Sequence, residues 1–171
     1  MSKLRLTKEI KQLERHQLEQ MILDAYAARK EIKEYFDFFL NPDVDRLIEK
    51  YKVAASKEFN RSKRGHSKAR ISVIKKLLKE FEGFQPGYDK EIELMHYIVS
   101  FALMSETSVY FSETLMKGIS AIMLKMVETA DRNLVADKLM ASLAKLLDDD
   151  NSGTRYFRRY LRDELTTYRP L

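Results

Sequence analysis

The sequence predicts an all-α protein of about eight helices, arranged as antiparallel helical hairpins. Apolar residues recur every three or four positions along almost every segment, which is the spacing of one face of a helix. The 5 glycines and 3 prolines lie mostly between these segments, where they end one helix before the next begins. A compact bundle and a short α-solenoid-like stack both fit this pattern, and the lack of a fixed-period repeat favours the bundle.

The first half of the chain is predicted to begin with a helical stretch that Thr7 caps and that runs to residue 25. A break near His16 would divide this stretch into two short helices. An aromatic helix follows over residues 31–40. The turn Asn41-Pro42-Asp43 ends it, because proline disfavours the α conformation at the preceding residue and suits a helix start.

The rest of the chain is predicted to continue with a helix over residues 44–59 and a polar, basic loop over residues 60–68. Ser67 is expected to cap the next helix, and Asp131 or Asn133 a later one. The remaining helices are expected over residues 71–81, 88–106, 109–130, 131–147 and 154–168. With 171 residues, the chain is expected to form a single domain over residues 1–171, with a subdivision near residues 83–87 as the alternative.

The run KEYFDFFLNP at residues 33–42, followed by Leu47, EKY at 49–51 and KEF at 57–59, resembles a family of short bacterial proteins. That family is classed as a domain of unknown function and is commonest in Bacteroidetes. The resemblance is close over the first half of the chain and looser over the second. It implies an all-helical bacterial protein, but no activity and no catalytic residue.

Composition excludes several classes of protein. With 0 cysteines, the chain has no disulfide scaffold, cysteine zinc site, thiol nucleophile or iron–sulfur cluster. Its apolar stretches fall short of the ~20 residues that a membrane-spanning helix needs, and the N-terminus lacks the apolar segment of a signal peptide. The expected location is therefore the cytoplasm, with no membrane partner.

Positive charge is concentrated in a basic segment, residues 57–79, which begins at Lys57 and ends at Lys79. It holds nine lysines or arginines and one acid, Glu58. On a helix, its later lysines form one stripe beside the apolar face, and such a stripe is suited to follow a phosphate backbone. A solvated face with ion pairs to neighbouring helices is the alternative. The candidate nucleic-acid-binding residues here are Lys63, Arg64, Lys68, Lys75, Lys76 and Lys79.

A second basic stripe lies in the last predicted helix. Its members are spaced i, i+3, i+4 and i+7, so they share an arc of about 100°. Guanidinium groups bind phosphates and stack on bases, so this stripe is a second candidate for nucleic-acid binding. Alternatively, it pairs with the acidic run at residues 148–150 or with another subunit. The residues are Arg155, Arg158, Arg159 and Arg162.

Metal and catalytic motifs are incomplete. Glu93 and His96 form the Glu-x-x-His half of a di-iron motif, but the sequence holds no second copy. The acidic run resembles the start of a calcium loop, yet Arg159 occupies the position that must supply a bidentate carboxylate. The sequence also lacks a glycine-rich phosphate loop and a nucleophile elbow. We therefore expect no metal and no cofactor, and an enzyme is the less favoured class.

The central helices are rich in methionine, which fills irregular cores or lines adaptable binding grooves. Gly118 lies inside one of them and is expected to allow a close approach of two helices. The sequence therefore favours a non-enzymatic helical interaction or scaffold module that binds a protein partner or a second copy of itself. The alternative is a nucleic-acid-binding protein that uses the basic segment and the arginine stripe.

Overall fold

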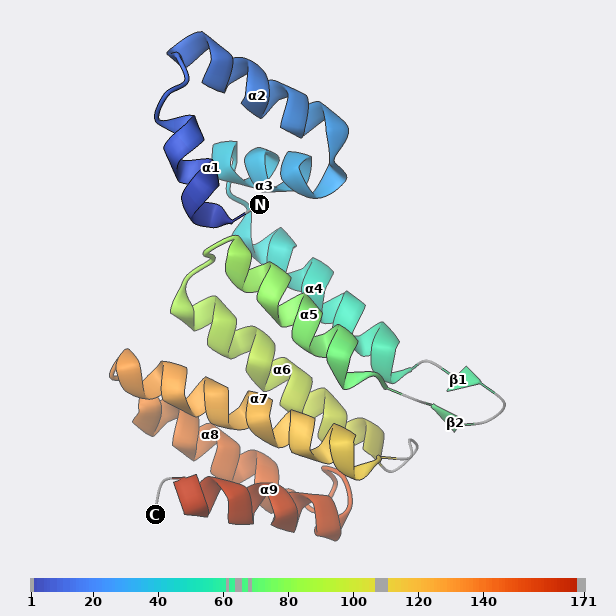
Figure 1. Ribbon diagram of the computed structural model, residues 1–171. Helices are drawn as coiled ribbons and strands as arrows, with labels where there is room; N and C mark the ends of the chain where they lie inside the picture. The colour runs from blue at the N-terminus through green and yellow to red at the C-terminus, as the bar shows by residue number, and fades with distance from the viewer. Residues whose placement is uncertain (1, 61, 64–65, 68, 107–110, 169–171) are drawn as a thin grey trace. The chain divides into compact units, whose positions relative to one another are not determined.

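The computed structural model describes residues 2–60, 62–63, 66–67, 69–106 and 111–168, and for 62–63 and 66–67 only the backbone (Figure 1). Helices account for most of these residues, so the predicted all-α class is confirmed. The helices are α1 (Lys3–Ile10), α2 (Arg15–Ala28), α3 (Lys30–Leu40), α4 (Val44–Phe59), α5 (Ile71–Gly83), α6 (Tyr88–Glu106), α7 (Glu113–Arg132), α8 (Ala136–Asp148) and α9 (Arg155–Tyr168). Two short antiparallel strands, β1 (Ser62–Lys63) and β2 (His66–Ser67), lie where the sequence predicted a loop.

The chain divides into two compact units. The first unit is Met1–Asp43 and contains α1 to α3, and the second unit is Val44–Leu171 and contains α4 to α9. Residues 83–87 lie inside the second unit, at the connection between α5 and α6. A single domain over residues 1–171 stays a prediction.

The first unit begins with a helix that starts earlier than the sequence predicts. Ser2 caps α1, because its hydroxyl accepts a hydrogen bond from the backbone N–H of Arg5 at 3.3 Å. The predicted cap, Thr7, instead lies within the helix and donates its hydroxyl to the Lys3 carbonyl at 2.9 Å. The predicted break near His16 is present: α1 ends at Ile10 and α2 begins at Arg15.

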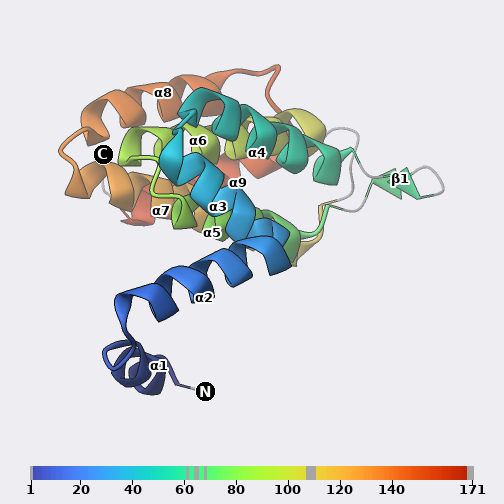
Figure 2. The ribbon, with the colours of Figure 1, turned by 90° about the horizontal axis from the view of Figure 1, so that it is seen from above.

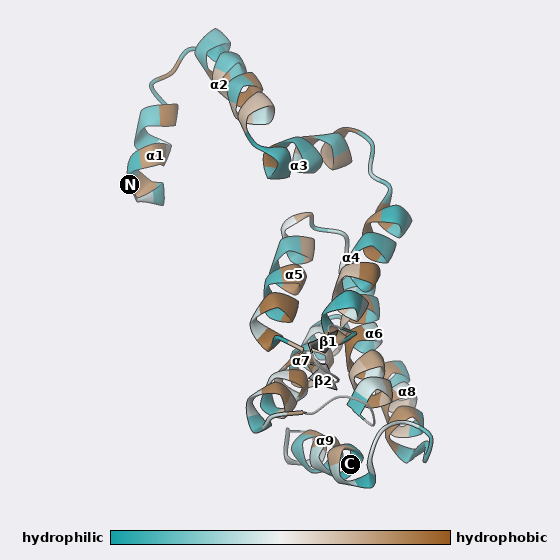
Figure 3. Cartoon of the chain, turned by 90° about the vertical axis from the view of Figure 1, so that its right-hand side faces the viewer, coloured by the Kyte–Doolittle hydropathy of each residue, from teal (hydrophilic) through white to brown (hydrophobic). Residues whose placement is uncertain are grey.

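Within the first unit, α2 packs against α3. The Tyr26 hydroxyl donates a hydrogen bond of 2.7 Å to the Asp37 carboxylate, and the Tyr26 ring lies 6.5 Å from that of Phe36. No described residue of these three helices is buried, although each helix includes hydrophobic residues (Figure 3). The first unit is therefore helical without a core of its own.

The second unit is a compact stack of helical hairpins, as the sequence predicted. The hairpins α4–α5, α6–α7 and α8–α9 follow one another in chain order (Figure 1). The helices α4, α6 and α8 form one layer and α5, α7 and α9 the other (Figures 2 and 3). Their largest fully buried side chains include Phe59, Phe81, Ile98, Met123 and Phe157. All buried apolar side chains among the described residues lie in this unit.

The structure confirms the prediction for Gly118 and shows where the central methionines lie. A Cβ atom added to Gly118 in α7 would lie 2.1 Å from Cγ1 of Ile71 in α5, so glycine is what allows these helices to approach. Most of the central methionines are core residues, whereas Met104 is 65% exposed. The buried ones are Met95, Met116, Met123 and Met126.

Two further predicted helix caps are also wrong. Arg70, not Ser67, precedes α5, and Ser67 belongs to β2. Asn133 ends α7 by donating its side-chain amide to a backbone carbonyl one turn earlier, and Leu134 then takes a positive φ of 58° before α8 begins. Among the described residues, none of the helices is long and apolar enough to cross a membrane.

Candidate functional site

The start of α5 is fixed by a buried acid, which in the sequence is the one acidic residue of the basic segment. Glu58 at the end of α4 is 7% exposed and accepts three hydrogen bonds from Arg70. One comes from the backbone N–H at 3.2 Å and two from the guanidinium group, at 2.6 and 3.0 Å. This fork-to-carboxylate pair holds both ends of the basic connection between α4 and α5.

The lysines of α5 form the described part of the basic segment. Lys75, Lys76 and Lys79 are exposed on the helix, whereas Ile74 and Leu78 are buried. Lys76 lies 3.5 Å from Glu80, and the other two lysines have no ion-pair partner among the described residues. The predicted residues Arg64 and Lys68 lie outside the described residues, and so does the side chain of Lys63.

The helix α9 carries the arginine stripe on a side separate from its core face. The Thr154 hydroxyl accepts a hydrogen bond from the backbone N–H of Phe157, which caps the helix. Phe157, Leu161 and Leu165 are buried, whereas Tyr156 is 71% exposed. The aromatic side chains of this helix are therefore divided, with Phe157 in the core and Tyr156 and Tyr168 exposed.

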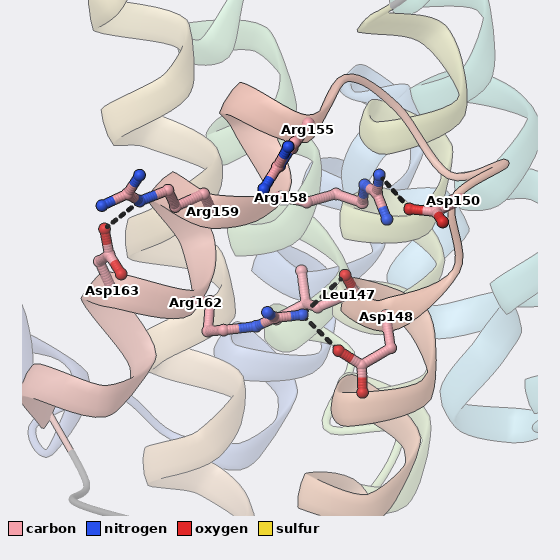
Figure 4. Close-up of a pocket in the computed structure, with 8 residues that line it drawn as sticks. All are labelled: Leu147, Asp148, Asp150, Arg155, Arg158, Arg159, Arg162 and Asp163. Atoms are coloured by element: carbon pink, nitrogen blue, oxygen red, sulfur yellow. Dashed lines mark hydrogen bonds and ion pairs between the residues drawn. The ribbon is translucent and has the colours of Figure 1, made fainter.

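Two of the four arginines hold the end of α8 against α9 (Figure 4). Arg158 is buried, and its guanidinium group donates to Asp150 at 2.7 Å. Arg162 donates to the Leu147 carbonyl at 3.0 Å and to the Asp148 carboxylate. The sequence leaves open whether these arginines pair with the acidic run upstream, and Arg158 and Arg162 do so.

The other two arginines, Arg155 and Arg159, are exposed and more available to a ligand. Arg159 lies 3.8 Å from Asp163, and both side chains are largely exposed. Exposed pairs of this kind contribute little to stability. Arg155 is exposed and has no ion-pair partner among the described residues.

These side chains line one pocket of about 440 Å³ at the junction of α8 and α9. Its charged lining consists of the four arginines together with Asp148, Asp150 and Asp163. Among the described residues, the Nε atom of Arg158 is the one buried side-chain nitrogen or oxygen without a hydrogen-bond partner. A buried donor left unpaired is costly, so such an atom is unusual in a folded protein.

The two basic stripes lie on helices that are separated by a third. The helix α7 packs against both α5 and α9, and it lies between them in the same layer (Figures 1 and 3). The arginine pocket opens at the α8 side of α9. The lysines of α5 and the arginines of α9 are therefore best treated as two separate surfaces.

The metal candidates Glu93 and His96 are engaged by other side chains. Each carboxylate oxygen of Glu93 accepts from a lysine, Lys52 at 2.7 Å and Lys90 at 3.1 Å. The hydrogen bond from Lys52, followed by that from Lys90, holds the pKa of Glu93 below its usual value. Within the described part of the chain, we find no cluster of three potential metal ligands.

His96 lies in a second pocket, of about 430 Å³, between α6 and α8. Its Nε2 atom lies 3.0 Å from the Ser142 hydroxyl and its Nδ1 atom 3.4 Å from the Ser100 hydroxyl. Burial lowers the pKa of His96, so the imidazole is neutral at pH 7. The serine contact brings a hydroxyl to a neutral imidazole, but neither serine stood out in the sequence because both occupy ordinary helical positions.

Comparison with known proteins identifies a family without assigning a function. No curated protein matches the chain, and no solved structure matches it either. One family model, described as a family of unknown function (DUF6155), matches residues 1–156, which include all of the first unit and the second unit as far as the start of α9. This agrees with the family resemblance in the sequence, and the chain belongs to this family of unknown function.

Proposed function

We propose that this protein is a non-enzymatic helical interaction module that self-associates through its first unit. The observation that supports this proposal is the exposure of apolar side chains on α1, α2 and α3. Among the described residues, eight of the fourteen exposed large apolar side chains lie within these 43 residues. The most exposed are Leu4, Leu23, Phe39 and Leu40, which are 60–71% accessible.

Such a surface is unfavourable in water unless something covers it. Each Å² of apolar surface removed from water contributes about 25 cal/mol. Isolated helices shorter than about 12–15 residues are also marginal, and α1 and α3 have 8 and 11 residues. Because the unit lacks buried side chains among its described residues, its helices gain stability from association.

The charges of the first unit favour a second copy as the partner. Residues 1–43 carry eight basic and eight acidic side chains, so two copies of this unit do not repel each other through net charge. The charges are also unevenly distributed. Residues 1–15 hold five basic and two acidic side chains, and residues 31–43 hold one basic and four acidic. A two-fold arrangement can therefore place the basic end of one copy against the acidic end of the other.

Sedimentation velocity on the full chain over a range of concentrations tests this proposal. We expect a species of twice the chain mass of 20.2 kDa. The double variant Phe39→Gln/Leu40→Gln removes two exposed apolar side chains from α3 and is expected to sediment as a monomer with unchanged helicity. A wild-type chain that stays monomeric at the highest concentration would refute self-association.

A matched control uses equally exposed apolar residues of the second unit. Leu134 and Tyr156 are 94% and 71% exposed. The variant Leu134→Gln/Tyr156→Gln loses comparable apolar surface outside the first unit, so it is expected to remain a dimer. If this control dissociates and the α3 variant does not, the interface lies in the second unit and the proposal fails.

A second candidate function is nucleic-acid binding through α5. It is supported by the exposure of Lys75, Lys76 and Lys79, two of which have no acidic partner among the described residues. Arg158 and Arg162 do not add to this surface, because they hold the end of α8. The candidate surface is therefore narrower than the sequence suggested.

Fluorescence anisotropy with labelled DNA and RNA at increasing salt tests this candidate. Binding through lysines weakens steeply with salt. On double-stranded DNA, a plot of the logarithm of the binding constant against the logarithm of the salt concentration has a slope of about −0.9 for each phosphate contacted. Changing Lys75, Lys76 and Lys79 to glutamate is expected to abolish binding while leaving helicity intact. Binding that survives this triple change would show that α5 is not the surface.

A further inference from the structure

We propose that the pocket between α8 and α9 binds the phosphate group of a small molecule. Four arginine side chains line this one pocket (Figure 4). Its volume of about 440 Å³ lies within the range of small-molecule sites. This proposal stands independently of self-association, because it rests on residues of the second unit alone.

The acids that line the pocket lie mostly in water, whereas the most deeply placed arginine does not. The side chains of Asp150 and Asp163 are 92% and 68% exposed, and that of Arg158 is 10% exposed. A carboxylate at the rim orients a guanidinium group but gains little energy from the pairing when it is itself solvated. A ligand anion can displace Asp163 from Arg159 at small cost, since these groups lie 3.8 Å apart.

Some hydrogen-bond donors of the arginines that line the pocket remain unused. Arg155 has no ion-pair partner among the described residues, and the buried Nε of Arg158 has no acceptor. Each guanidinium group carries five N–H donors in a planar fork that matches the oxygens of a phosphate. Arg155 and Arg158 also lie in the first turn of α9, where positive charge opposes the helix dipole and a bound anion offsets it.

The number of donors favours a terminal phosphate over a carboxylate or a backbone phosphodiester. A terminal phosphate presents three acceptor oxygens and nearly two negative charges near neutral pH. A carboxylate has two oxygens and a phosphodiester has two free ones, each with one negative charge. The arginine pocket therefore favours a phosphate monoester, whereas the lysines of α5 lie on an open helix face.

The test is a titration of the full chain, labelled with ¹⁵N, followed through the Nε–Hε signals of its arginines. The probes are inorganic phosphate, glycerol phosphate and a short single-stranded DNA, with chloride at equal ionic strength as the blank. We expect saturable shifts of the Arg155, Arg158 and Arg159 signals with the first two probes. The signal of Arg132, an exposed arginine of α7 paired with Glu128, is expected to stay in place.

Two charge-matched variants decide whether the pocket is responsible for phosphate binding. Arg155→Gln/Arg159→Gln removes two exposed charges from the pocket and is expected to weaken glycerol phosphate binding about tenfold or more. Lys75→Gln/Lys79→Gln removes two charges from α5 and is expected to leave that binding unchanged. Equal weakening in both variants would mean non-specific attraction. That result, an absence of saturable shifts, or a pocket response to DNA alone would overturn the proposal.

Discussion

The two units of the chain have the same kind of sequence but different packing. Helices α1 to α3 and helices α4 to α9 all carry apolar residues at helical spacing. In the second unit these residues form a core that includes Phe59, Phe81 and Phe157, each 0% exposed. In the first unit, Phe39 and Leu40 of α3 are 68% and 70% exposed.

This contrast shows what helical periodicity can and cannot predict. Periodicity indicates that a helix has an apolar face, and such a face is stable only when another surface covers it. It does not indicate whether the cover comes from the same unit or from another molecule. The second unit covers its faces by stacking three hairpins, whereas in the first unit α2 packs against α3. The difference between the units is therefore a difference in available partners.

The largest expected effect compares one phenylalanine from each unit. Phe59→Ala leaves a cavity beside Phe101, whose ring centroid lies 5.7 Å from that of Phe59, and should cost about 3–5 kcal/mol of unfolding free energy. Phe39→Ala should change it by no more than about 0.5 kcal/mol when measured at concentrations where the chain is monomeric. Urea unfolding monitored by circular dichroism measures both. A loss at Phe39 that matches Phe59 would show that α3 is buried in the monomer, and the contrast would disappear.

The close contact between α5 and α7 gives the next effect. An alanine at Gly118 brings its Cβ to 2.1 Å from Cγ1 of Ile71, so the helices must separate. We expect Gly118→Ala to cost about 1–3 kcal/mol, because overpacking outweighs the gain of up to about 1 kcal/mol in helix propensity. Adding Ile71→Ala should recover part of the loss, and a double-mutant cycle measures the coupling. Strictly additive losses would mean that the two residues do not touch.

The buried acid before α5 gives a smaller effect. Glu58→Gln removes the charge that accepts three hydrogen bonds from Arg70, and we expect a loss of about 1–2 kcal/mol because Arg70 is itself half-exposed. The matched control is Glu80→Gln in α5, which loses only an exposed pair with Lys76 and should change stability by less than about 0.5 kcal/mol. Equal effects in chemical unfolding would deny Glu58 its structural role.

Much of the fold was predictable from the sequence, because breakers and apolar spacing act locally. The spans of α4, α6 and α9 follow from the sequence pattern, and so does the close approach at Gly118. The caps were less predictable, since Ser2 and Thr7 are both good capping residues and backbone geometry decides between them. The strands β1 and β2 are two residues each, too short for any alternation to show.

The candidate surfaces were predictable as charges but not as contacts. The sequence placed Arg155, Arg158, Arg159 and Arg162 on one arc of a helix, which the structure retains. It left open which of them pair with the upstream acids, because that depends on how α8 packs against α9. The role of Glu58 was not predictable either, because the sequence does not show whether a lone acid in a basic segment is buried or exposed.

The smallest expected effect concerns the pocket of His96 in the second unit. Burial holds the pKa of His96 below its ordinary value of 6.5. The contribution of neutral His96 to stability is therefore fully present above about pH 6.5, and it is lost as the pH falls through the lower pKa of the folded state. Unfolding midpoints measured between about pH 8 and pH 5.5 should fall more in the wild type than in His96→Gln.

The other titratable groups around this pocket allow the assignment to His96. They are Tyr88, Asp89, Glu93 and Lys138. Hydrogen bonds from Lys52 and Lys90 hold the pKa of Glu93 below its usual value, so Glu93 stays ionised between about pH 8 and pH 5.5. His16 and His66 are present in both proteins and cancel in the comparison. If the unfolding midpoints of the wild type and of His96→Gln changed with pH in parallel, the imidazole would be as well solvated in the folded chain as in the unfolded one. The second unit would then be open at α6 and α8, and its contrast with the first unit would be weaker than the burial of its core indicates.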